Sequence, residues 1–565
     1  MDLQRTLLIV AIGALSFMLL TNWVAFKETK SGQETPVVSR LTDTHATSSD
    51  TPAQTLTSEA TDNDDIPDVS TTEGIATDTP QVTNNSGNGN IVQVFTDELQ
   101  LAIDLNGGDI IELALVEHLD ELEGDAFVLL EKNQNRTYVA QSGLIGPNGI
   151  DSPKRAVYHS AQSRYELAEG QDELIVDLLY NDSDGIEVIK RFTFQRSHYL
   201  VNIDYIVSNN GNQRFSANLY GQLKRDSSPA PNAANGNMGI QPFLGAAITQ
   251  PDDRFSKFSF QDMSEEPFKK QLPGGWIAMI QHYFLSAWIP NPEQTHTYST
   301  RVTTSGFNIA GFISPTFGVD PGESITVNAR FYAGPKDQPR LKEISPYLDL
   351  SVDYGWLWWI AQPLFWLLTW IHTFVGNWGV AIILLTVIIK AVFFKLSATS
   401  YRSMANMRKM APKITALREQ YSDDKQKQSQ AMMDLYRKEK INPLGGCLPI
   451  LIQMPVFIAL YWVLMESYEL RHAPFFLWIK DLSVMDPYFI LPLIMGASMW
   501  FMQKLNPTPP DPMQAKIMQW MPVVFTFFFL WFPSGLVLYW VVNNLLSIAQ
   551  QWYITRQIEM ADAKA

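Results

Sequence analysis

Four long runs without a charged residue dominate the C-terminal part of the chain. They cover residues 356–389, 441–465, 487–503 and 517–555. An apolar helix of about 20 residues is long enough to cross the roughly 30 Å hydrocarbon core of a bilayer. Another apolar run follows Arg5 near the N-terminus. The chain is therefore expected to be a multidomain membrane protein.

The N-terminal segment predicts an anchor followed by a linker. Residues 1–27 are expected to form an uncleaved transmembrane anchor. A cleavable signal peptide is the alternative, but NWVAFKE lacks the small-x-small pattern of a signal peptidase site. Residues 28–90 are rich in Ser, Thr, Asp and Pro and nearly free of aromatic side chains. Such a segment cannot bury enough apolar surface to fold, so it is expected to be a disordered linker.

The next segment, residues 91–345, has the pattern of β-strands. Stretches such as DELIVDLLY, IEVIKRFTFQ and YLVNIDYIVSN alternate apolar and polar side chains, and NDSDG and NNGN separate them as turns. This pattern predicts a large antiparallel β-sandwich domain.

Charge and motif content exclude several classes of function. Residues 6–353 carry a net charge of −22 and the rest of the chain +6, and the sequence pI is about 5.0. A nucleic-acid binder is expected to be basic, so no direct nucleic acid binding is expected. With a single cysteine, Cys447, and eight scattered histidines, no metal site, cofactor or enzymatic activity is expected. GxSxG, Walker and GxGxxG strand-to-helix motifs are all missing from the sequence.

A basic segment fixes the expected topology. Residues 399–441 are predicted to form a cytoplasmic helical hairpin, and the stretch from Ser397 to Pro443 holds ten basic and five acidic side chains. Short basic loops remain in the cytoplasm. The helix expected at 354–375 cannot then also cross, because the basic loop would end on the outer side. Its five tryptophans favour an amphipathic helix at the membrane interface over a span.

The core is therefore expected to contain five transmembrane helices in addition to the anchor. Both termini are then cytoplasmic and the β domain is periplasmic. The predicted spans of the core are 378–398, 444–466, 488–504, 517–532 and 535–553, with a cytoplasmic tail at 554–565.

Lys390 is the unusual residue of this core. It follows 34 uncharged positions. A lysine at the centre of a membrane helix costs about 2.5–3.5 kcal/mol and needs a partner, water or a route to the interface. Snorkelling of its stem to the cytoplasmic interface is the simpler interpretation.

Other polar residues fall at a similar depth once the topology is imposed. They suggest a hydrated groove that opens to the cytoplasm and is closed toward the outside. Each could instead bond to its own helix or join two helices. The candidate groove residues are Lys390, Thr386, Gln453, Thr526, Asn543, Asn544 and Ser547.

Methionines recur along the predicted hairpin. Met404, Met407 and Met432 are candidates for an adaptable apolar contact surface, and packing between the two helices of the hairpin is the alternative.

The core contains four long and specific motifs. They are NPLGGCLPILIQMPVF (442–457), LRHAPFFLWIKDLSVMDPYFILP (470–492), DPMQAKIMQWMPV (511–523) and FPSGLVLYW (532–540). These motifs resemble those of the YidC/Oxa/Alb family of membrane protein insertases. The resemblance also covers the order of anchor, β domain, interfacial helix and helical core along the whole chain.

The resemblance implies a Gram-negative inner-membrane protein that inserts and helps to fold membrane proteins, alone or with the Sec translocon. Its clients would be nascent membrane proteins, and the ribosome or targeting factors would meet the hairpin. Lys390 falls on the family's groove cation, which is typically arginine. Trp540 falls where an aromatic, commonly tyrosine, is usual. The third and fifth spans would offer an apolar slide to client helices, and Met454, Phe457, Phe525 and Phe528 lie on them.

Two other function classes stay open at this point. A small-molecule transporter or lipid flippase would use the groove as a substrate site, but the inverted repeats of many transporters are not apparent. A sugar-processing enzyme would use the β-sandwich, and a fold alone gives little support for that.

Overall fold

The structure is a computed structural model that describes residues 65–67, 90–229, 242–421, 424–438, 448–505 and 512–562. The predicted anchor at 1–27 and most of the predicted linker at 28–90 lie outside these residues. All the described residues belong to one unit, Asp62–Ala565.

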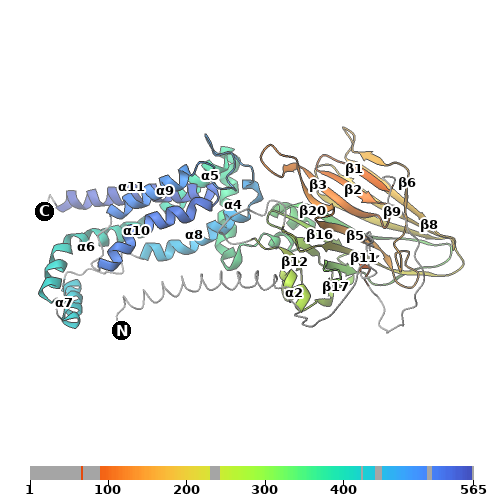
Figure 1. Ribbon diagram of the computed structural model, residues 1–565, viewed down its shortest axis with the longest axis horizontal. Helices are drawn as coiled ribbons and strands as arrows, with labels where there is room; N and C mark the ends of the chain where they lie inside the picture. The colour runs from red at the N-terminus through yellow and green to blue at the C-terminus, as the bar shows by residue number, and fades with distance from the viewer. Residues whose placement is uncertain are drawn as a thin grey trace, which may run out of the picture. The chain divides into compact units, whose positions relative to one another are not determined.

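Two sheets make up the β domain (Figure 1). The larger holds eleven strands in the order β14-β17-β18-β11-β5-β4-β3-β2-β1-β7, with β19 paired to β11, and the smaller nine in the order β13-β12-β15-β16-β20-β10-β9-β8-β6. The strands are β1 Ile91–Phe95, β2 Leu99–Asp104, β3 Asp109–Leu119, β4 Ala126–Lys132, β5 Thr137–Ile145, β6 His159–Ser160, β7 Arg164–Glu166, β8 Glu173–Asn181, β9 Ile186–Gln195, β10 Leu200–Asn209, β11 Phe215–Arg225, β12 Gly245–Ile248, β13 Ser256–Ser259, β14 Lys269–Pro273, β15 Ile277–Ile280, β16 Phe284–Pro290, β17 Thr295–Val302, β18 Asn308–Ile313, β19 Phe317–Val319 and β20 Ser324–Pro335.

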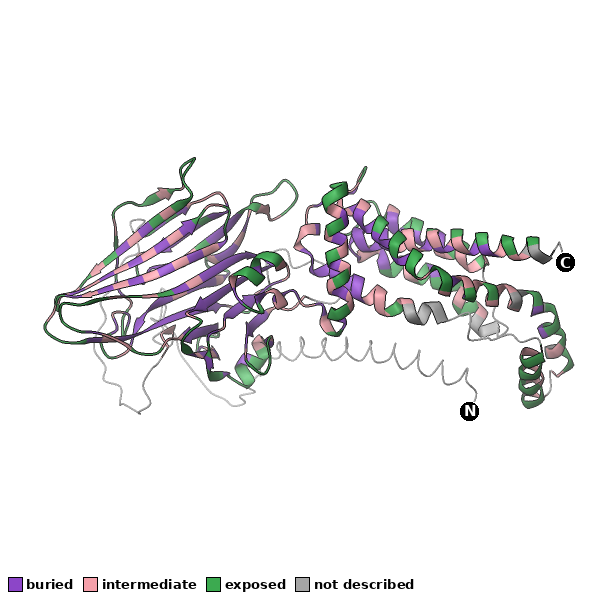
Figure 2. Cartoon of the chain, turned by 180° about the vertical axis from the view of Figure 1, so that it is seen from behind, coloured by how far each residue is buried: buried purple, intermediate pink, exposed green. Residues whose placement is uncertain are grey.

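Alternating side chains explain how the sheets pack. Every second residue of β9 and β10 is buried, and the two strands pair with Val201 opposite Phe194 and Val207 opposite Val188. One face of each strand therefore enters the core between the sheets, as a period of two requires. Figure 2 shows the buried residues concentrated along the strands. The largest fully buried side chains of this core include Trp276 and Trp288.

One pairing departs from the expected antiparallel sandwich. β7 pairs parallel to β1, with Gln93 opposite Arg164 and Phe95 opposite Glu166. A parallel neighbour requires a long connection, and residues 96–163, which include β2 to β6, supply it. The prediction of a wholly antiparallel sandwich is therefore wrong at this edge.

Apart from α2, which lies between β13 and β14, the helices follow the strands of the β domain. Among the described residues the α-helices are α2 Phe260–Glu265, α3 Gln338–Ile344, α4 Trp358–Val375, α5 Trp378–Val392, α6 Phe394–Gln420, α7 Lys425–Lys438, α8 Leu448–Glu466, α9 Ile490–Leu505, α10 Pro512–Phe528 and α11 Ser534–Asp562, and the short 3-10 turns are η2 Leu348–Ser351, η3 Gly355–Leu357, η5 Tyr468–Leu470 and η6 Phe529–Trp531.

The turn between α4 and α5 follows from its sequence. Gly376 ends α4 in the left-handed conformation, at φ 63°, which favours glycine. Asn377 then caps α5, because its side-chain oxygen accepts a hydrogen bond from the backbone N–H of Val380 at 3.0 Å. Helix α11 packs against α5, α6, α8 and α9, and α10 packs against α9.

The predicted span at 378–398 is not one helix. The backbone leaves the helical conformation at Phe393, with φ −89° and ψ 7°, and α5 and the start of α6 meet at 67°. By length and apolar composition, no single helix of the described residues meets the criterion for crossing a membrane, whereas the bent pair Trp378–Val392 and Phe394–Ala405 does. The boundaries of the other predicted spans stay predictions.

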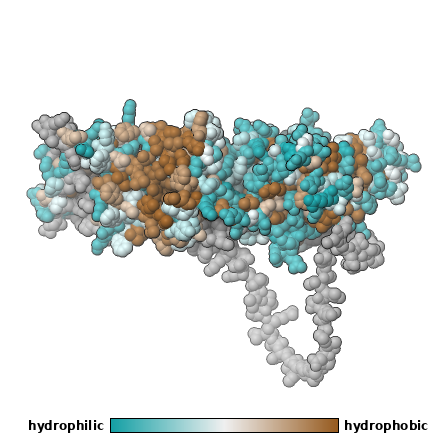
Figure 3. Space-filling view, turned by 90° about the horizontal axis from the view of Figure 1, so that it is seen from above, coloured by the Kyte–Doolittle hydropathy of each residue, from teal (hydrophilic) through white to brown (hydrophobic). Residues whose placement is uncertain are grey.

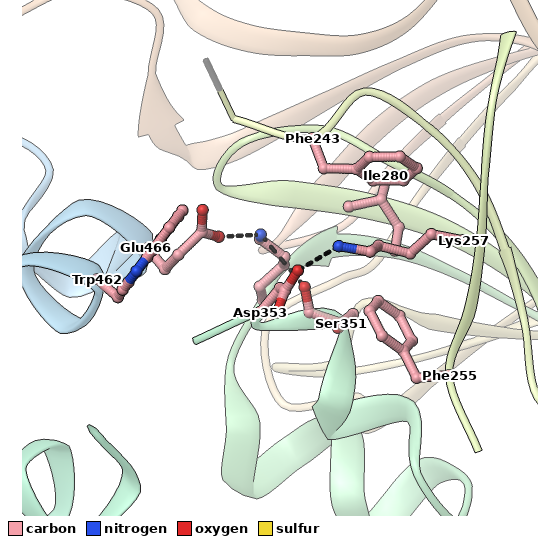
Figure 4. A pocket seen from close by; sticks show the side chains of 9 residues that line it. Phe243, Phe255, Lys257, Ile280, Ser351, Asp353, Trp462 and Glu466 are labelled. Atoms are coloured by element: carbon pink, nitrogen blue, oxygen red, sulfur yellow. Dashed lines mark hydrogen bonds and ion pairs between the residues drawn. The ribbon is translucent and has the colours of Figure 1, made fainter. Parts of the chain in front are cut away.

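Lys336 and Glu466 form a buried ion pair between the β domain and the end of α8. The Lys336 ammonium lies 2.6 Å from the Glu466 carboxylate, and their side chains are 3% and 7% exposed. A cavity of about 250 Å³ adjoins this pair, with Lys257 and Asp353 forming a second ion pair on its wall (Figure 4). His282 hydrogen-bonds the Met465 carbonyl at 2.7 Å, and burial, with the charge of Lys336, lowers its pKa to about 3.

A second set of buried charges lies inside the β domain. Lys190 is fully buried and donates hydrogen bonds to the carbonyls of Gly107 and Ser142, both at 3.1 Å. Arg155 ion-pairs with Asp109 and with the fully buried Asp151. Desolvation lowers the pKa of Lys190 to about 7.

The buried ion pair of Lys336 and Glu466 predicts that losing one partner costs more stability than losing both. Removing one partner by Glu466→Leu should destabilise the protein by about 3–5 kcal/mol, because the other charge is left buried and unpaired. The double variant Lys336→Met with Glu466→Leu should recover most of this loss. Thermal unfolding in detergent measures both effects, and equal unfolding temperatures for the single and double variants would contradict this account.

Lys190 predicts a pH dependence of stability. Its pKa is lower in the folded protein than the ordinary value of 10.5, so the unfolded chain binds more protons between pH 7 and 10. Stability should therefore gain a component that rises with pH, by up to about 1.4 kcal/mol per pH unit. Lys190→Met should remove that component, while Lys270→Met, at an exposed lysine, should not. Unfolding temperatures at pH 7, 8 and 9 test the difference between the variants.

Candidate functional site

Lys390 lies near the end of α5 with its ammonium held inside the helical bundle. Lys390 is only 6% exposed. The ammonium donates a hydrogen bond to the Ser547 hydroxyl of α11 at 2.8 Å and lies 3.5 Å from the side-chain oxygen of Gln453 on α8. Among the described residues, the structure gives Lys390 neutral oxygen partners and no ion pair. Its positive charge is therefore solvated by protein dipoles and is not neutralised by a carboxylate.

The partners of Lys390 are connected to one another. The Gln453 amide donates to the Asn543 side chain at 2.7 Å, and the Ser547 hydroxyl donates to the Asn543 carbonyl, also at 2.7 Å. Tyr401 of α6 also hydrogen-bonds Ser547. Helices α5, α6, α8 and α11 thus meet in one polar network. We call Lys390, Gln453, Asn543 and Ser547 the lysine cluster.

Asn544 does not join the lysine cluster, although it follows Asn543 directly. It is 2% exposed and donates to the Ser498 hydroxyl of α9 at 3.0 Å. Consecutive residues of an α-helix point about 100° apart, so the two asparagines contact different neighbouring helices. Ser498 was missed from the sequence, where a lone serine between apolar residues gives no signal.

Thr386 and Thr526 also lie outside the lysine cluster. Each hydroxyl donates to a carbonyl one turn earlier on its own helix, to Ile382 and Pro522 respectively, at 2.7 Å. The Thr526 side chain also covers Gly496 of α9, where a Cβ would lie 1.9 Å from its oxygen. The hydroxyls of these two threonines therefore bond to their own helices, which is one of the alternatives to a groove role given above.

Trp540 lies beside the lysine cluster and packs against a group of aromatic side chains. It lies three residues before Asn543 on α11, so the two side chains share a helix face. Its ring packs edge-on against the ring of Phe457, with 4.4 Å between the ring centres. It also packs at a tilt against the ring of Phe529, with 5.1 Å between the centres. Phe525 lies 6.4 Å away. Trp540 thus joins α8 and α10 beside the polar group.

The four predicted slide residues differ in exposure. Met454 is 44% and Phe528 36% exposed, whereas Phe457 and Phe525 are only partly exposed and pack against Trp540. Six exposed apolar residues of α10 were missed, although they recur every three or four positions with Phe528, a pattern that is readable in the sequence. They are Ile517, Trp520, Met521, Val523, Val524 and Phe527.

The hairpin methionines named from the sequence are only partly exposed. Met404, Met407 and Met432 are all partly buried, and Met410 is buried. Met433, which was not predicted, is 54% exposed. In the described residues no group of histidine, cysteine, aspartate or glutamate has the arrangement of a metal site.

Comparison with known proteins gives the family. The model of the YidC periplasmic domain matches residues 91–367, and that of the 60Kd inner membrane protein matches residues 370–562. A membrane protein insertase YidC of Cellvibrio japonicus is 52% identical over 571 residues, covering 100% of both chains. The one of a Marinomonas species is 55% identical over 502 residues, covering 88% of this chain and 91% of its own.

Among solved structures, an active YidC insertase with its first transmembrane domain resolved is 20% identical, with a TM-score of 0.37, covering 83% of this chain and 93% of its own. The sequence relatives and the two family models confirm the resemblance carried by the core motifs. The chain belongs to the YidC family of membrane protein insertases.

Proposed function

We propose that this chain is a membrane protein insertase of a bacterial inner membrane, with nascent membrane proteins as its clients. The observation that carries the proposal is the lysine cluster, a single buried cation with neutral partners between apolar helices. Full-length relatives named as insertases support the same activity. The reaction needs no cofactor and no bond chemistry.

The lysine cluster would attract the hydrophilic part of a client. At about 4 Å and an effective dielectric near 20, an ammonium attracts a carboxylate by roughly 4 kcal/mol, and desolvation offsets much of this. Lys390 already has a hydroxyl and an amide oxygen within reach, so its charge is tolerated before a client arrives. A polar client segment would add to this network and then leave it without breaking an ion pair within the chain.

The apolar helix of the client would leave along α8 and α10. The exposed stripe of α10 and the exposed Met454 of α8 form apolar surface, and Figure 3 shows hydrophobic side chains gathered over the helical part of the chain. Trp540 packs between these helices and the lysine cluster. Polar and apolar parts of one client would thus have adjacent binding surfaces.

The finer arrangement follows from the charge pattern. We propose six spans, an interfacial helix at 354–375, cytoplasmic termini and a periplasmic β domain. Tryptophans 356, 358, 359, 366 and 370 are each at least 49% exposed, as an interfacial helix requires. The hairpin would meet the ribosome or targeting factors, with Met433 as its exposed apolar contact, and the Sec translocon would act beside the core.

Substitution of Lys390 tests the role of charge. In liposomes with purified protein, insertion of a single-span client should persist with Lys390→Arg and fall about 5- to 30-fold with Lys390→Ala, which corresponds to roughly 1–2 kcal/mol. Lys390→Glu should insert the client least of the three variants, because it reverses the charge. Lys395→Ala, at an exposed lysine five residues later, is the matched control and should insert normally.

Ser547→Ala separates charge from packing in the same assay. It removes the nearer of the two oxygen partners of Lys390 and keeps the ammonium. If the charge attracts the client, Ser547→Ala should insert far better than Lys390→Ala. Equal losses in the two variants would show that the lysine cluster only holds the helices together.

A crosslinking pair tests the apolar path. A photoreactive amino acid in place of Phe528, which is 36% exposed, should crosslink to a client arrested during insertion. The same probe at Phe529, which is 3% exposed and adjacent in sequence, should not. Client adducts of similar yield at both positions would argue against a path along the exposed face of α10.

A further inference from the structure

One residue inside the predicted linker, Asp65, has defined contacts with the β domain. The Asp65 carboxylate forms an ion pair with Lys224 of β11, with one oxygen at 2.6 Å from the ammonium. The Asp65 carbonyl accepts hydrogen bonds from the side chains of Gln222 at 2.7 Å and Arg301 of β17 at 3.1 Å. Both the side chain and the backbone of Asp65 are therefore held.

The receiving residues form a built site. Gln222 and Lys224 are two apart on β11 and so lie on the same face of the sheet, and they are 2% and 9% exposed. The Lys224 ammonium also lies 4.3 Å from the Phe307 ring centre. Long polar side chains lose conformational entropy when they are held in this way, and a bound carboxylate with charge-assisted hydrogen bonds offsets that loss.

A chain of polar contacts within the β domain orients Gln222. The Gln222 amide donates to Gln141 at 2.9 Å, Gln141 donates to Asp109 at 2.9 Å, and Asp109 ion-pairs with Arg155. The Gln222 amide donates to Gln141, and its oxygen accepts a hydrogen bond from Arg301 at 3.4 Å. Both partners belong to the sheet, so the amide orientation of Gln222 is fixed without the linker.

We propose that this face of β11 and β17 is a binding site for an acidic peptide segment and that Asp65–Pro67 of the same chain is its resident ligand. The site pins the linker to the β domain at Asp65, which lies 26 positions before Ile91, the first residue of β1. Only residues 28–64, at most about 130 Å of extended chain, would then separate the predicted anchor from the pinned point. The proposal does not depend on the insertase activity.

Binding within the chain explains why one ion pair is enough. The 22 residues from 68 to 89 connect Pro67 to Asn90, and a short connection gives an effective concentration in the millimolar range. A free acidic peptide would have to compete with this concentration. The site should therefore accept a second peptide only when the resident segment is changed.

Hydrogen exchange of the full-length protein in detergent tests the pinning. Amides of residues 62–69 should exchange at least about 5-fold faster in Lys224→Ala than in the wild type, because the closed state is lost. Lys270→Ala, at an exposed lysine on β14 of the same sheet, is the matched control and should leave the exchange unchanged. Identical exchange in the wild type and Lys224→Ala would overturn the proposal.

A peptide tests the ligand class. A dye-labelled peptide with the sequence of residues 62–70, DNDDIPDVS, should bind a full-length variant whose residues 64–68 are replaced by Gly and Ser. Fluorescence anisotropy should show weaker binding to the wild type, where the resident segment competes. Adding Lys224→Ala to the variant, or Asp65→Asn to the peptide, should abolish binding. No binding to the variant, or binding that ignores both changes, would refute an acidic-peptide site.

Discussion

A lysine charge buried among apolar helices and held by neutral oxygens is the interaction on which the functional account depends. A carboxylate partner would neutralise Lys390 and leave it with little attraction for a client. With no polar partner, the charge would cost several kcal/mol and the helices would separate or let water in. The Ser547 hydroxyl and the Gln453 amide lie between these extremes, since they stabilise the ammonium and leave its charge uncancelled.

The β domain contains both kinds of buried cation. Arg155 has two carboxylate partners there, whereas Lys190, like Lys390, is solvated by neutral oxygens. From Asp109, the hydrogen bonds continue through Gln141 and Gln222 to Asp65 at the surface. Buried polar groups need hydrogen-bond partners. The amides of Gln141 and Gln222 provide them in a connected network that runs from the core to the surface.

Sequence reasoning grouped the residues of the lysine cluster by depth but did not give the helix faces on which they lie. Lys390, Gln453, Asn543 and Ser547 were expected together because they fall at a similar depth on three predicted spans, and the structure joins them by hydrogen bonds. Thr386 and Thr526 share that depth and contact their own helices instead. The difference lies in rotation about the helix axis, which is set by contacts with neighbouring helices that a single sequence does not show.

Local pattern was determined by the sequence itself: alternation gave the β-strands, charge-free runs gave the apolar helices, and Gly376 with Asn377 gave a turn between two of them. These features depend on residues a few positions apart. Only the tertiary structure decided that β7 pairs parallel to β1, that the helix breaks at Phe393, and that Asp65 meets Lys224 across 159 positions. Such contacts depend on how segments far apart in the sequence pack against one another. The local pattern of apolar and polar residues does not specify that packing.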